Sequence, residues 1–271
     1  MQAVNHHFHL PQNPILRQSL CCIWQTDGFP DFQNEIILPK GIVEIIFDFG
    51  DSLPVQARLD KQSGALARCF INGFNTTPIY LHHPEPHTYF GVQLQPVEVK
   101  NLLGVPAREF SNQAIDGALV HRELDALWHQ LAEKQTFEER VDIVSGWLSE
   151  QSIASSQQEK MLGAFLNNRA GNFKSVAQLA DAICYSPRHL SRKMHENTGM
   201  NAEEMLQYKK YLHALHLMHQ PSLSLTEIAY ESGFVDQSHF IKCFQAYAQR
   251  TPGAYRRSLS SLPGHLFENV R

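Results

Sequence analysis

Two stretches of the chain carry the same pattern: SVAQLADAICYSPRHLSRKMHEN at Ser175–Asn197 and SLTEIAYESGFVDQSHFIKCFQAYA at Ser224–Ala248. When Ala180 is aligned with Ala229, the apolar and polar positions match, and the second copy has one extra residue near its centre. An internal repeat of this kind indicates one structural unit used twice. The repeat therefore decides the fold of the C-terminal part of the chain.

Each copy has the pattern of two short helices joined by a turn. Ala180 and Ala229 stand where the first helix would cross the second, and a larger side chain there would hold the backbones apart. Gly233 suits a left-handed turn that ends a helix, and Cys184 takes the equivalent place in the first copy. The positions expected to face inward are apolar, namely Leu179, Ile183, Leu190, Met194, Ile228, Phe234, Phe240 and Phe244. We therefore predict two helix-turn-helix units.

Capping residues mark where the helices start. Ser186 followed by Pro187 is an N-cap with a favoured first-turn proline, and Asp236 caps the equivalent helix of the second copy. Between the copies, Asn201–His219 has helical periodicity and is followed by Pro221. A helix of that length spans about 28 Å, close to the ~34 Å that separates successive major-groove faces of a duplex. One chain with such a spacer could read two adjacent grooves.

Specific motifs give the region from about Lys160 to Arg257 a family resemblance. They are SPRHLSRKMHENTG in the first copy and EIAYESGFVDQSHFIKCFQAYAQRTPGAYR in the second, including the closing Thr251-Pro252 and Tyr255-Arg256. The region resembles the C-terminal domain of the AraC/XylS family of bacterial transcription regulators. This resemblance implies a sequence-specific DNA-binding transcription regulator.

The chain departs from the family pattern in two places. Met200-Asn201-Ala202 stands where the family usually has Ser-Pro after the glycine, and Asn201 is left as the cap of the next helix. Lys242 stands where the family usually has an arginine. Lysine is a point charge without the planar fork of arginine, so a two-bond contact to guanine is not expected from Lys242.

The resemblance places the DNA contacts on the second helix of each unit. The residues that it implies are Arg188, Ser191 and Arg192 in the first unit, and Gln237, Ser238, His239 and Lys242 in the second. Arg188 and Arg192 are four residues apart, so they share a helix face and can reach guanine N7 and O6. Gln237 suits adenine. His239 and its counterpart His189 could contact phosphate or anchor the helix to the domain.

Charge divides the chain into two unlike parts. The formal net charge of the whole chain is -4. Acidic residues outnumber basic ones by nine up to Glu159, whereas basic residues outnumber acidic ones by five from Lys160 onward. This asymmetry fits a C-terminal part that meets an anion and an N-terminal part with another task.

The N-terminal part has the pattern of strands followed by helices. Strands are predicted within Glu35–Gly50, at Phe70–Phe74 and at Tyr89–Leu94, and helices over Val97–Leu148 with breaks near Gly104 and Gln135. Serine and glutamine dominate residues 149–158, which indicates a linker. Beyond the linker, everything has the pattern of helix. The fold class is therefore α+β: a β-rich α+β sensor or dimerisation domain over residues 1–150, then an all-α DNA-binding domain over residues 157–259.

A second resemblance concerns the N-terminal domain. The segments GIVEIIFDFGD, INGF and YFGVQLQPVEVKNLLGVP resemble a sensor-type domain fused to many AraC/XylS regulators, often a cupin-like β barrel. The resemblance implies control by a small molecule or by dimerisation. It names no effector, so the effector-binding residues stay unknown.

The alternative from another class is a cupin-type metal-dependent enzyme that carries a DNA-targeting domain. Its candidate ligands are His82, His83, Glu85 and His87, but Pro84 and Pro86 stiffen this short loop and the HxH spacing of cupin ligands is missing. A solvent-exposed turn is the preferred interpretation. No catalytic arrangement, metal site or cofactor is therefore expected. A helical module that binds only proteins is disfavoured by the basic balance and the polar helix faces.

The remaining expectations concern location and partners. The start MQAVNHHFHL lacks the basic and apolar regions of a signal peptide, and the five cysteines have no CxxC spacing, so we expect a cytoplasmic protein with reduced thiols and no membrane partner. The expected partners are double-stranded DNA at a promoter or operator, RNA polymerase, a small-molecule effector, and a second copy of the chain.

Overall fold

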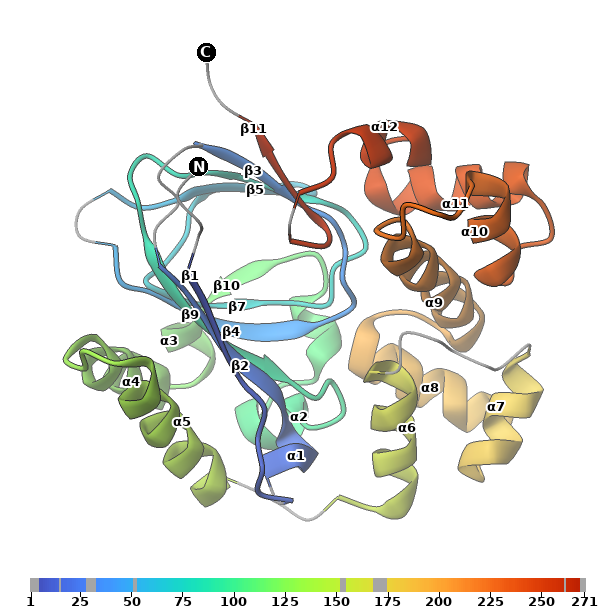
Figure 1. The fold of residues 1–271 in the computed structure, drawn as a ribbon. Coiled ribbons are helices and arrows are strands. Elements are labelled where there is room, and N and C mark those ends of the chain that lie inside the picture. Colours follow the sequence, from blue (N-terminus) through green and yellow to red (C-terminus); the bar gives the residue numbers. More distant parts are fainter. Residues whose placement is uncertain are drawn as a thin grey trace.

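The computed structural model describes residues 5–14, 16–27, 33–50, 53–151, 155–167, 175–260 and 262–268. A β-rich part made of two sheets lies beside a helical part that contains the repeated units (Figure 1). This order of a β-rich domain and then a helical domain agrees with the predicted fold class.

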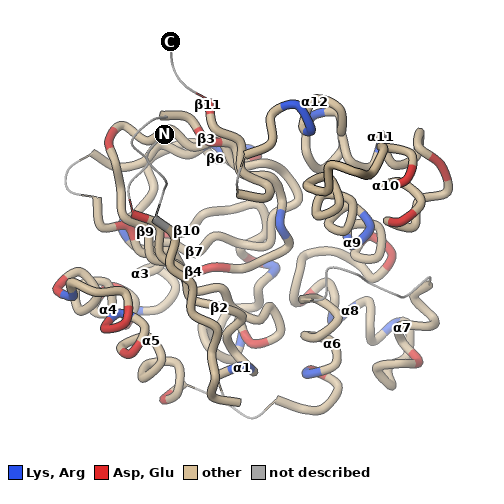
Figure 2. The backbone as a smooth tube through the Cα atoms, in the orientation of Figure 1, with Lys and Arg blue, Asp and Glu red and all other residues tan. Residues whose placement is uncertain are grey.

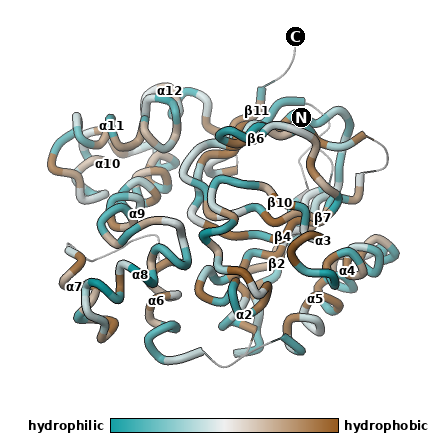
Figure 3. Tube along the Cα trace, turned by 180° about the vertical axis from the view of Figure 1, so that it is seen from behind, coloured by the Kyte–Doolittle hydropathy of each residue, from teal (hydrophilic) through white to brown (hydrophobic). Residues whose placement is uncertain are grey.

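The first sheet has six strands in the order β1-β2-β9-β4-β7-β10, and all neighbours are antiparallel. Val43, Ile45 and Phe47 of its strand β4 alternate toward one buried core, because successive residues of a strand point to opposite faces. Figure 3 shows hydrophobic residues along β4 and the strands near it. The strands are β1 (Asn5–His9), β2 (Leu20–Asp27), β4 (Val43–Asp48), β7 (Cys69–Asn72), β9 (Thr88–Leu94) and β10 (Ala114–Asp116).

The second sheet has five strands in the order β11-β3-β8-β5-β6. They are β3 (Asn34–Ile37), β5 (Gln56–Leu59), β6 (Gln62–Ala65), β8 (Ile79–His82) and β11 (His265–Glu268). Strand β11 comes from the far C-terminal end and pairs antiparallel with β3. The prediction that everything beyond the linker is helical is therefore wrong at β11. Four residues are too few to give a period, and the partner strand is more than two hundred residues away in sequence.

Helices cover the outer face of the six-stranded sheet. Leu127 and Val144 from these helices belong to the same buried core as Ile45 and Phe47. The predicted breaks near Gly104 and Gln135 are confirmed, and Gly104 ends its helix with a φ of 74°. The prediction of helix over the rest of Val97–Leu148 is wrong at the short strand β10 (Ala114–Asp116), which pairs with the distant strand β7. The elements are α1 (Leu16–Ser19), α2 (Val99–Leu103), the 3-10 helix η1 (Ala107–Phe110), α3 (Gly117–Val120), α4 (Glu123–Ala132) and α5 (Phe137–Gln151). Acidic residues are prominent on α4 and α5 (Figure 2).

Helix α5 ends at Gln151 within the polar stretch at residues 149–158, and the helical part begins at Gln157 in the same stretch; residues 152–154 lie outside the described ranges. A long helix, α9, lies between the two repeated units and contacts helices of both (Figure 1). The helices are α6 (Gln157–Asn167), α7 (Val176–Ile183), α8 (Pro187–Thr198), α9 (Ala202–Leu217), α10 (Leu225–Glu231), α11 (Gln237–Ala248) and α12 (Pro252–Arg257).

The predicted helix starts are confirmed. The side chain of Ser186 accepts a hydrogen bond from the amide of His189, and that of Asp236 accepts one from His239. Asn201 and Glu204 form a reciprocal capping box at the start of α9. These contacts satisfy amides that would otherwise have no partner at the helix ends.

Candidate DNA-binding surface

The first helix-turn-helix unit consists of α7 and α8. Ala180, fully buried, lets the two helices approach, and Leu190 and Met194 of α8 pack inward. The turn between the helices depends on Cys184, which has a φ of 60° and thus takes the left-handed conformation that favours glycine. The amide of Tyr185 then donates to the carbonyl of Ala180. This geometry fixes which side of α8 faces outward.

The outward side of α8 carries an exposed polar row. Arg188 and Arg192 are both exposed on it, as predicted from their spacing, and His195 continues the row one turn further on. We call Arg188, Arg192 and His195 the first recognition stripe. Ser191 lies at its flank and is half-buried, because its hydroxyl oxygen accepts a hydrogen bond from the amide of Ala202 at the start of α9.

The second unit consists of α10 and α11. Ala229 is fully buried at the helix crossing, and Gly233 has a φ of 82° in the turn. The exposed row on α11 is Ser238, Lys242 and Gln245, which we call the second recognition stripe.

The two stripes correspond residue by residue. Each member of the second stripe follows its counterpart in the first by 50 residues. His195 and Gln245 were not predicted. The same repeat, extended by one helical turn, would have identified both.

Two other predicted contacts of the second unit already have partners within the domain. The side-chain oxygen of Gln237 accepts a hydrogen bond from the hydroxyl of Thr226 at 3.0 Å. Nε2 of His239 lies 3.2 Å from the side-chain nitrogen of Gln207 on α9, and the ring meets Phe234 edge-on. The geometry therefore favours the anchoring role for His239 over a phosphate contact.

His189 also makes an intramolecular contact. Its ring stacks on Tyr185, with centroids 4.4 Å apart and planes 9° from parallel. Tyr185 follows the left-handed turn residue, so the stack ties the start of α8 to the turn. Both aligned histidines thus contact an aromatic ring of their own unit.

Ion pairs fix α8 on the side away from the first recognition stripe. Lys193 lies 3.6 Å from a carboxylate oxygen of Glu159 on α6 and 3.5 Å from one of Glu196. Lys100 of α2 donates to Glu196 at 2.8 Å, and this contact is the main cause that lowers the pKa of Glu196. The network joins α8 to α6 and to the β-rich domain.

The helical domain is also docked on the β-rich domain by side-chain hydroxyls that donate to backbone carbonyls across the boundary. The hydroxyl of Ser111, just after η1, donates to the carbonyl of Thr198 at the end of α8. A side chain at Gly199 would meet the Ser111 hydroxyl at 2.6 Å, and its φ of 78° also favours glycine. The buried hydroxyls of Tyr208 and Tyr211 on α9 donate to the carbonyls of Asn75 and Pro39.

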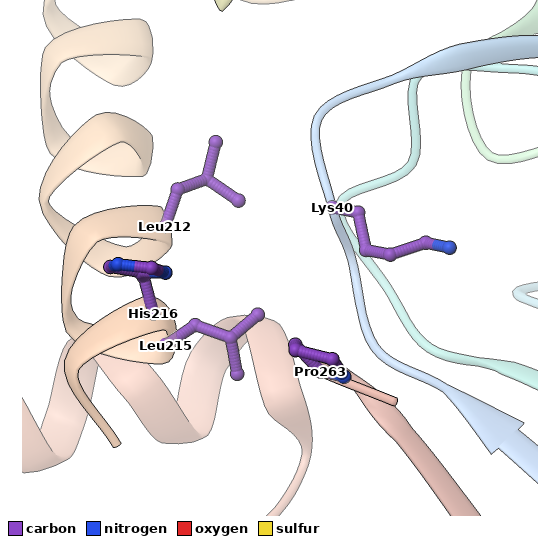
Figure 4. Close-up of a pocket in the computed structure, with 5 residues that line it drawn as sticks. All are labelled: Lys40, Leu212, Leu215, His216 and Pro263. Carbon is purple, nitrogen blue, oxygen red and sulfur yellow. The ribbon is translucent and has the colours of Figure 1, made fainter. Parts of the chain in front are cut away.

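A pocket lies at this boundary between the domains. Leu212, Leu215 and His216 of α9 line one side, and Lys40 and Pro263 line the other (Figure 4). The prediction from sequence treated the two domains as separate, and nothing in it indicated this contact.

The loop proposed as a metal site is part of a buried hydrogen-bond network. His83 and His87 are each 3% exposed, so the interpretation of this loop as a solvent-exposed turn is wrong for both residues. Nε2 of His83 lies 3.1 Å from Glu35 on β3, and Nδ1 of His87 lies 2.7 Å from Asp48 on β4. These carboxylates are distant in sequence, so local composition could not indicate that they bury the histidines.

The other two candidate ligands point elsewhere. Nδ1 of His82 lies 2.9 Å from the side chain of Asn34, and Glu85 accepts a hydrogen bond from the amide of Leu53. Across the described ranges, no three His, Cys, Asp or Glu side chains are grouped as metal ligands.

Glu35 is the centre of the buried network. Lys40 can only donate, so Nε2 of His265, 3.1 Å away, must accept its hydrogen bond. Nδ1 of His265 therefore carries the ring proton and donates a hydrogen bond to Glu35. Nε2 of His83 donates to the other oxygen of Glu35, and Nδ1 of the same ring lies 3.1 Å from the hydroxyl of Tyr89. Burial alone would raise the pKa of Glu35, but the hydrogen bonds from His265 and His83 outweigh it and lower that pKa to about 2. Burial, followed by the charge of Lys40, lowers the pKa of His265.

Comparisons with known proteins bear on both domains. A helix-turn-helix domain family matches residues 179–258, and a domain of unknown function, DUF6597, matches residues 7–116. The HTH-type transcriptional regulator GlxA of Rhizobium meliloti is 38% identical over 87 residues, which are 32% of this chain and 26% of that protein. The HTH-type transcriptional activator RhaS of Yersinia pestis is 30% identical over 120 residues, which are 43% of this chain and 44% of that protein. The chain thus matches less than half the length of either relative.

A solved structure shares the overall arrangement. ToxT of Vibrio cholerae aligns with a TM-score of 0.51 and 13% identity over 96% of this chain and 100% of that one. This likeness concerns the fold alone, a β-rich domain followed by a helical one. None of the helices in the described part of the chain has the length and apolar character needed to span a bilayer.

The two units and the matching domain family define residues 179–258 as a helix-turn-helix domain. This is the kind of domain that the resemblance of the motifs to the AraC/XylS family implies.

Proposed function

We propose that the protein is a sequence-specific transcription regulator that binds double-stranded DNA through both helix-turn-helix units. The observation that carries this proposal is the pair of corresponding exposed stripes on α8 and α11, with α9 between the two units. Exposed arginine, lysine and amide side chains on a recognition helix are the groups that contact base edges and phosphates in the major groove.

The roles of the residues follow from their chemistry. Arg188 and Arg192 read guanine through paired hydrogen bonds, while Lys242 meets phosphate as a point charge. Ser238 adds a short polar contact, and Ser191 and Gln237 support from the flanks, where they already hold intramolecular hydrogen bonds. His239 positions α11 against α9.

We further propose that the β-rich domain, residues 1–150, regulates the DNA-binding domain, residues 157–259, and catalyses no reaction. The relatives are named as transcription regulators, and the helical domain is docked on the β-rich one through α8 and α9. A small molecule bound by the β-rich domain would then alter DNA binding through that contact. The protein would act in the cytoplasm with RNA polymerase as its partner, alone or as a dimer.

Selection of genomic fragments by the purified full chain at one stated salt concentration tests the DNA proposal. The recovered fragments should share two short conserved blocks about one duplex turn apart. A double variant, Arg188→Ala with Arg192→Ala, serves as the control and should lose the block read by the first unit. Recovery of fragments without a shared sequence would refute sequence-specific binding.

A thermal-shift screen of metabolites tests the sensor proposal. A true effector should raise the unfolding temperature and change the affinity for the selected DNA. If no compound that stabilises the protein changes its DNA affinity, the regulatory role of the β-rich domain should be abandoned.

A further inference from the structure

The C-terminal end of the DNA-binding part returns to the β-rich domain and completes one of its sheets. Strand β11 follows α12 and lies along β3, with Leu266 opposite Ile36 and Phe267 opposite Glu35 (Figure 1). The amide of Leu38 also donates to the carbonyl of Gly264 at 2.7 Å. We call Gly264–Glu268 the C-terminal latch.

The latch is held firmly on the side of the β-rich domain. Leu266 is 2% exposed and belongs to the main buried core. His265 bridges Lys40 and Glu35 by the hydrogen bonds described above. Phe267 packs against the smaller core formed by Ile46, Val55, Phe70 and Tyr89.

The latch is also tied to α12, which packs against α11 of the second helix-turn-helix unit. The amide of Gly264 donates to the hydroxyl of Tyr255 at 3.1 Å, and Tyr255 is a fully buried residue of α12. The same hydroxyl lies 2.8 Å from Nε2 of His219, just after α9. The hydroxyl of Ser260 contacts the carbonyl of His265 at 2.7 Å, which stiffens the short connection.

The first unit is attached to the β-rich domain by other means, through Ser111 and the Lys100–Glu196 pair. The β-rich domain therefore holds the two units at separate points. In this state Arg188, Arg192 and Lys242 are exposed, so the latch does not cover the recognition stripes. Its effect on DNA binding must come from the position that it gives to the second unit.

We propose that the C-terminal latch is a positioning element that fixes the second unit relative to the first, and that Leu266 and His265 are its positioning residues. This inference rests on the proposed reading of DNA by both units. Two units that must fit successive grooves bind more tightly when their relative orientation is set in advance, because less freedom is lost on binding. Opening the latch leaves α9 to hold the second unit with less support and lowers the affinity for two-block DNA.

The test compares latch variants of the full chain with matched controls. Leu266→Asp places a carboxylate in the buried position, and a chain that ends at Leu259 removes the latch. Leu266→Met keeps an apolar side chain of similar volume, Glu268→Ala changes an exposed residue of the same strand, and a chain that ends at Glu268 retains the latch. Affinity is measured at one salt concentration on the selected duplex and on the same duplex with the second block scrambled.

The two latch-opening variants should lose about tenfold in affinity on the two-block duplex, while binding the scrambled duplex as the wild type does. The three controls should match the wild type on both. Hydrogen exchange should be faster in β3 and α12 of the two opened variants and unchanged in η1 and α8.

Several results would overturn the inference. They are equal affinity of wild type and opened variants on the two-block duplex, tighter binding by the opened variants, and equal losses on both duplexes. Unchanged exchange in α12 of the shortened chain would also overturn it. Failure of the wild type to distinguish the two duplexes would instead refute the proposed two-unit reading, and the inference with it.

Discussion

At the scale of single residues, Arg192 and Lys242 occupy equivalent places on the two recognition helices, yet only arginine can make two parallel hydrogen bonds to one guanine. We expect Arg192→Ala to lose roughly 1 to 3 kcal/mol of binding free energy and to relax the preference at one base position. Binding to the selected site and to a scrambled duplex measures this effect. Equal losses on the two duplexes would reduce Arg192 to a phosphate contact.

Lys242→Ala should behave differently. If its ammonium meets phosphate, affinity should fall nearly equally for specific and scrambled DNA, and the slope of log affinity against log salt should shrink by about one. A salt series with wild type and variant on both duplexes gives the answer. An unchanged slope with a loss confined to the selected site would assign base reading to Lys242.

The sequence predicted single residues well where the cause is local. The caps at Ser186, Asn201 and Asp236 depend only on a few following residues, and all three are confirmed. The buried positions of His83 and His87 were missed, because Glu35 and Asp48, which bind them, lie in other strands.

At the scale of elements, the two turns offer a matched pair of substitutions. Cys184 is exposed and has a φ of 60°, a conformation that costs a side-chain-bearing residue roughly 1 to 2 kcal/mol. Cys184→Gly should therefore stabilise the helical domain by up to about 1 kcal/mol, and Gly233→Ala should destabilise it by about the same amount. Denaturant unfolding followed by circular dichroism measures both. A destabilising Cys184→Gly would show that the thiol makes a contact worth more than the backbone strain.

Helices were predicted more completely than strands. The long periodic pattern of α9 gave its bounds to within two residues, whereas β5, β6, β8 and β11 have four residues each and no measurable period. A short strand forms because a distant segment pairs with it, so its own sequence does not show where it lies.

At the scale of the whole molecule, the Glu35 network links stability to pH. The pKa of Glu35 is lowered to about 2, against 4.5 in the unfolded chain. This difference contributes about 3 kcal/mol to the free energy of unfolding, which is present above pH 4.5 and lost as the pH falls toward 2. His265, whose pKa is also lowered, adds stability that is present above 6.5 and lost as pH falls below it. Both effects make the β-rich domain less stable in acid.

Glu35→Gln tests this pH dependence. The variant should be less stable than wild type at pH 7, and the difference should shrink between pH 4.5 and pH 3. Denaturation followed by tryptophan fluorescence reports on the β-rich domain, because all three tryptophans, Trp24, Trp128 and Trp147, lie there. A constant difference across this range would show that ionised Glu35 is not the stabilising form.

The contact between the two domains could not be predicted from sequence. Tyr208 and Tyr211 have the apolar spacing of an ordinary helix core, but their hydroxyls meet loop carbonyls of the β-rich domain. A hydroxyl bound to a backbone carbonyl leaves no pattern in the partner segment, because every residue has a carbonyl.

The central claim is that one chain reads two adjacent grooves at a separation set by α9, whose 16 residues span about 24 Å. The most direct measurement is the affinity of the full chain for the selected duplex with about 5 or about 10 base pairs inserted between its two blocks. Because the spacer is a single helix, both insertions should reduce the affinity to that of a duplex with only one block. Full affinity on either insertion would contradict a fixed separation, and with it the proposed two-groove reading.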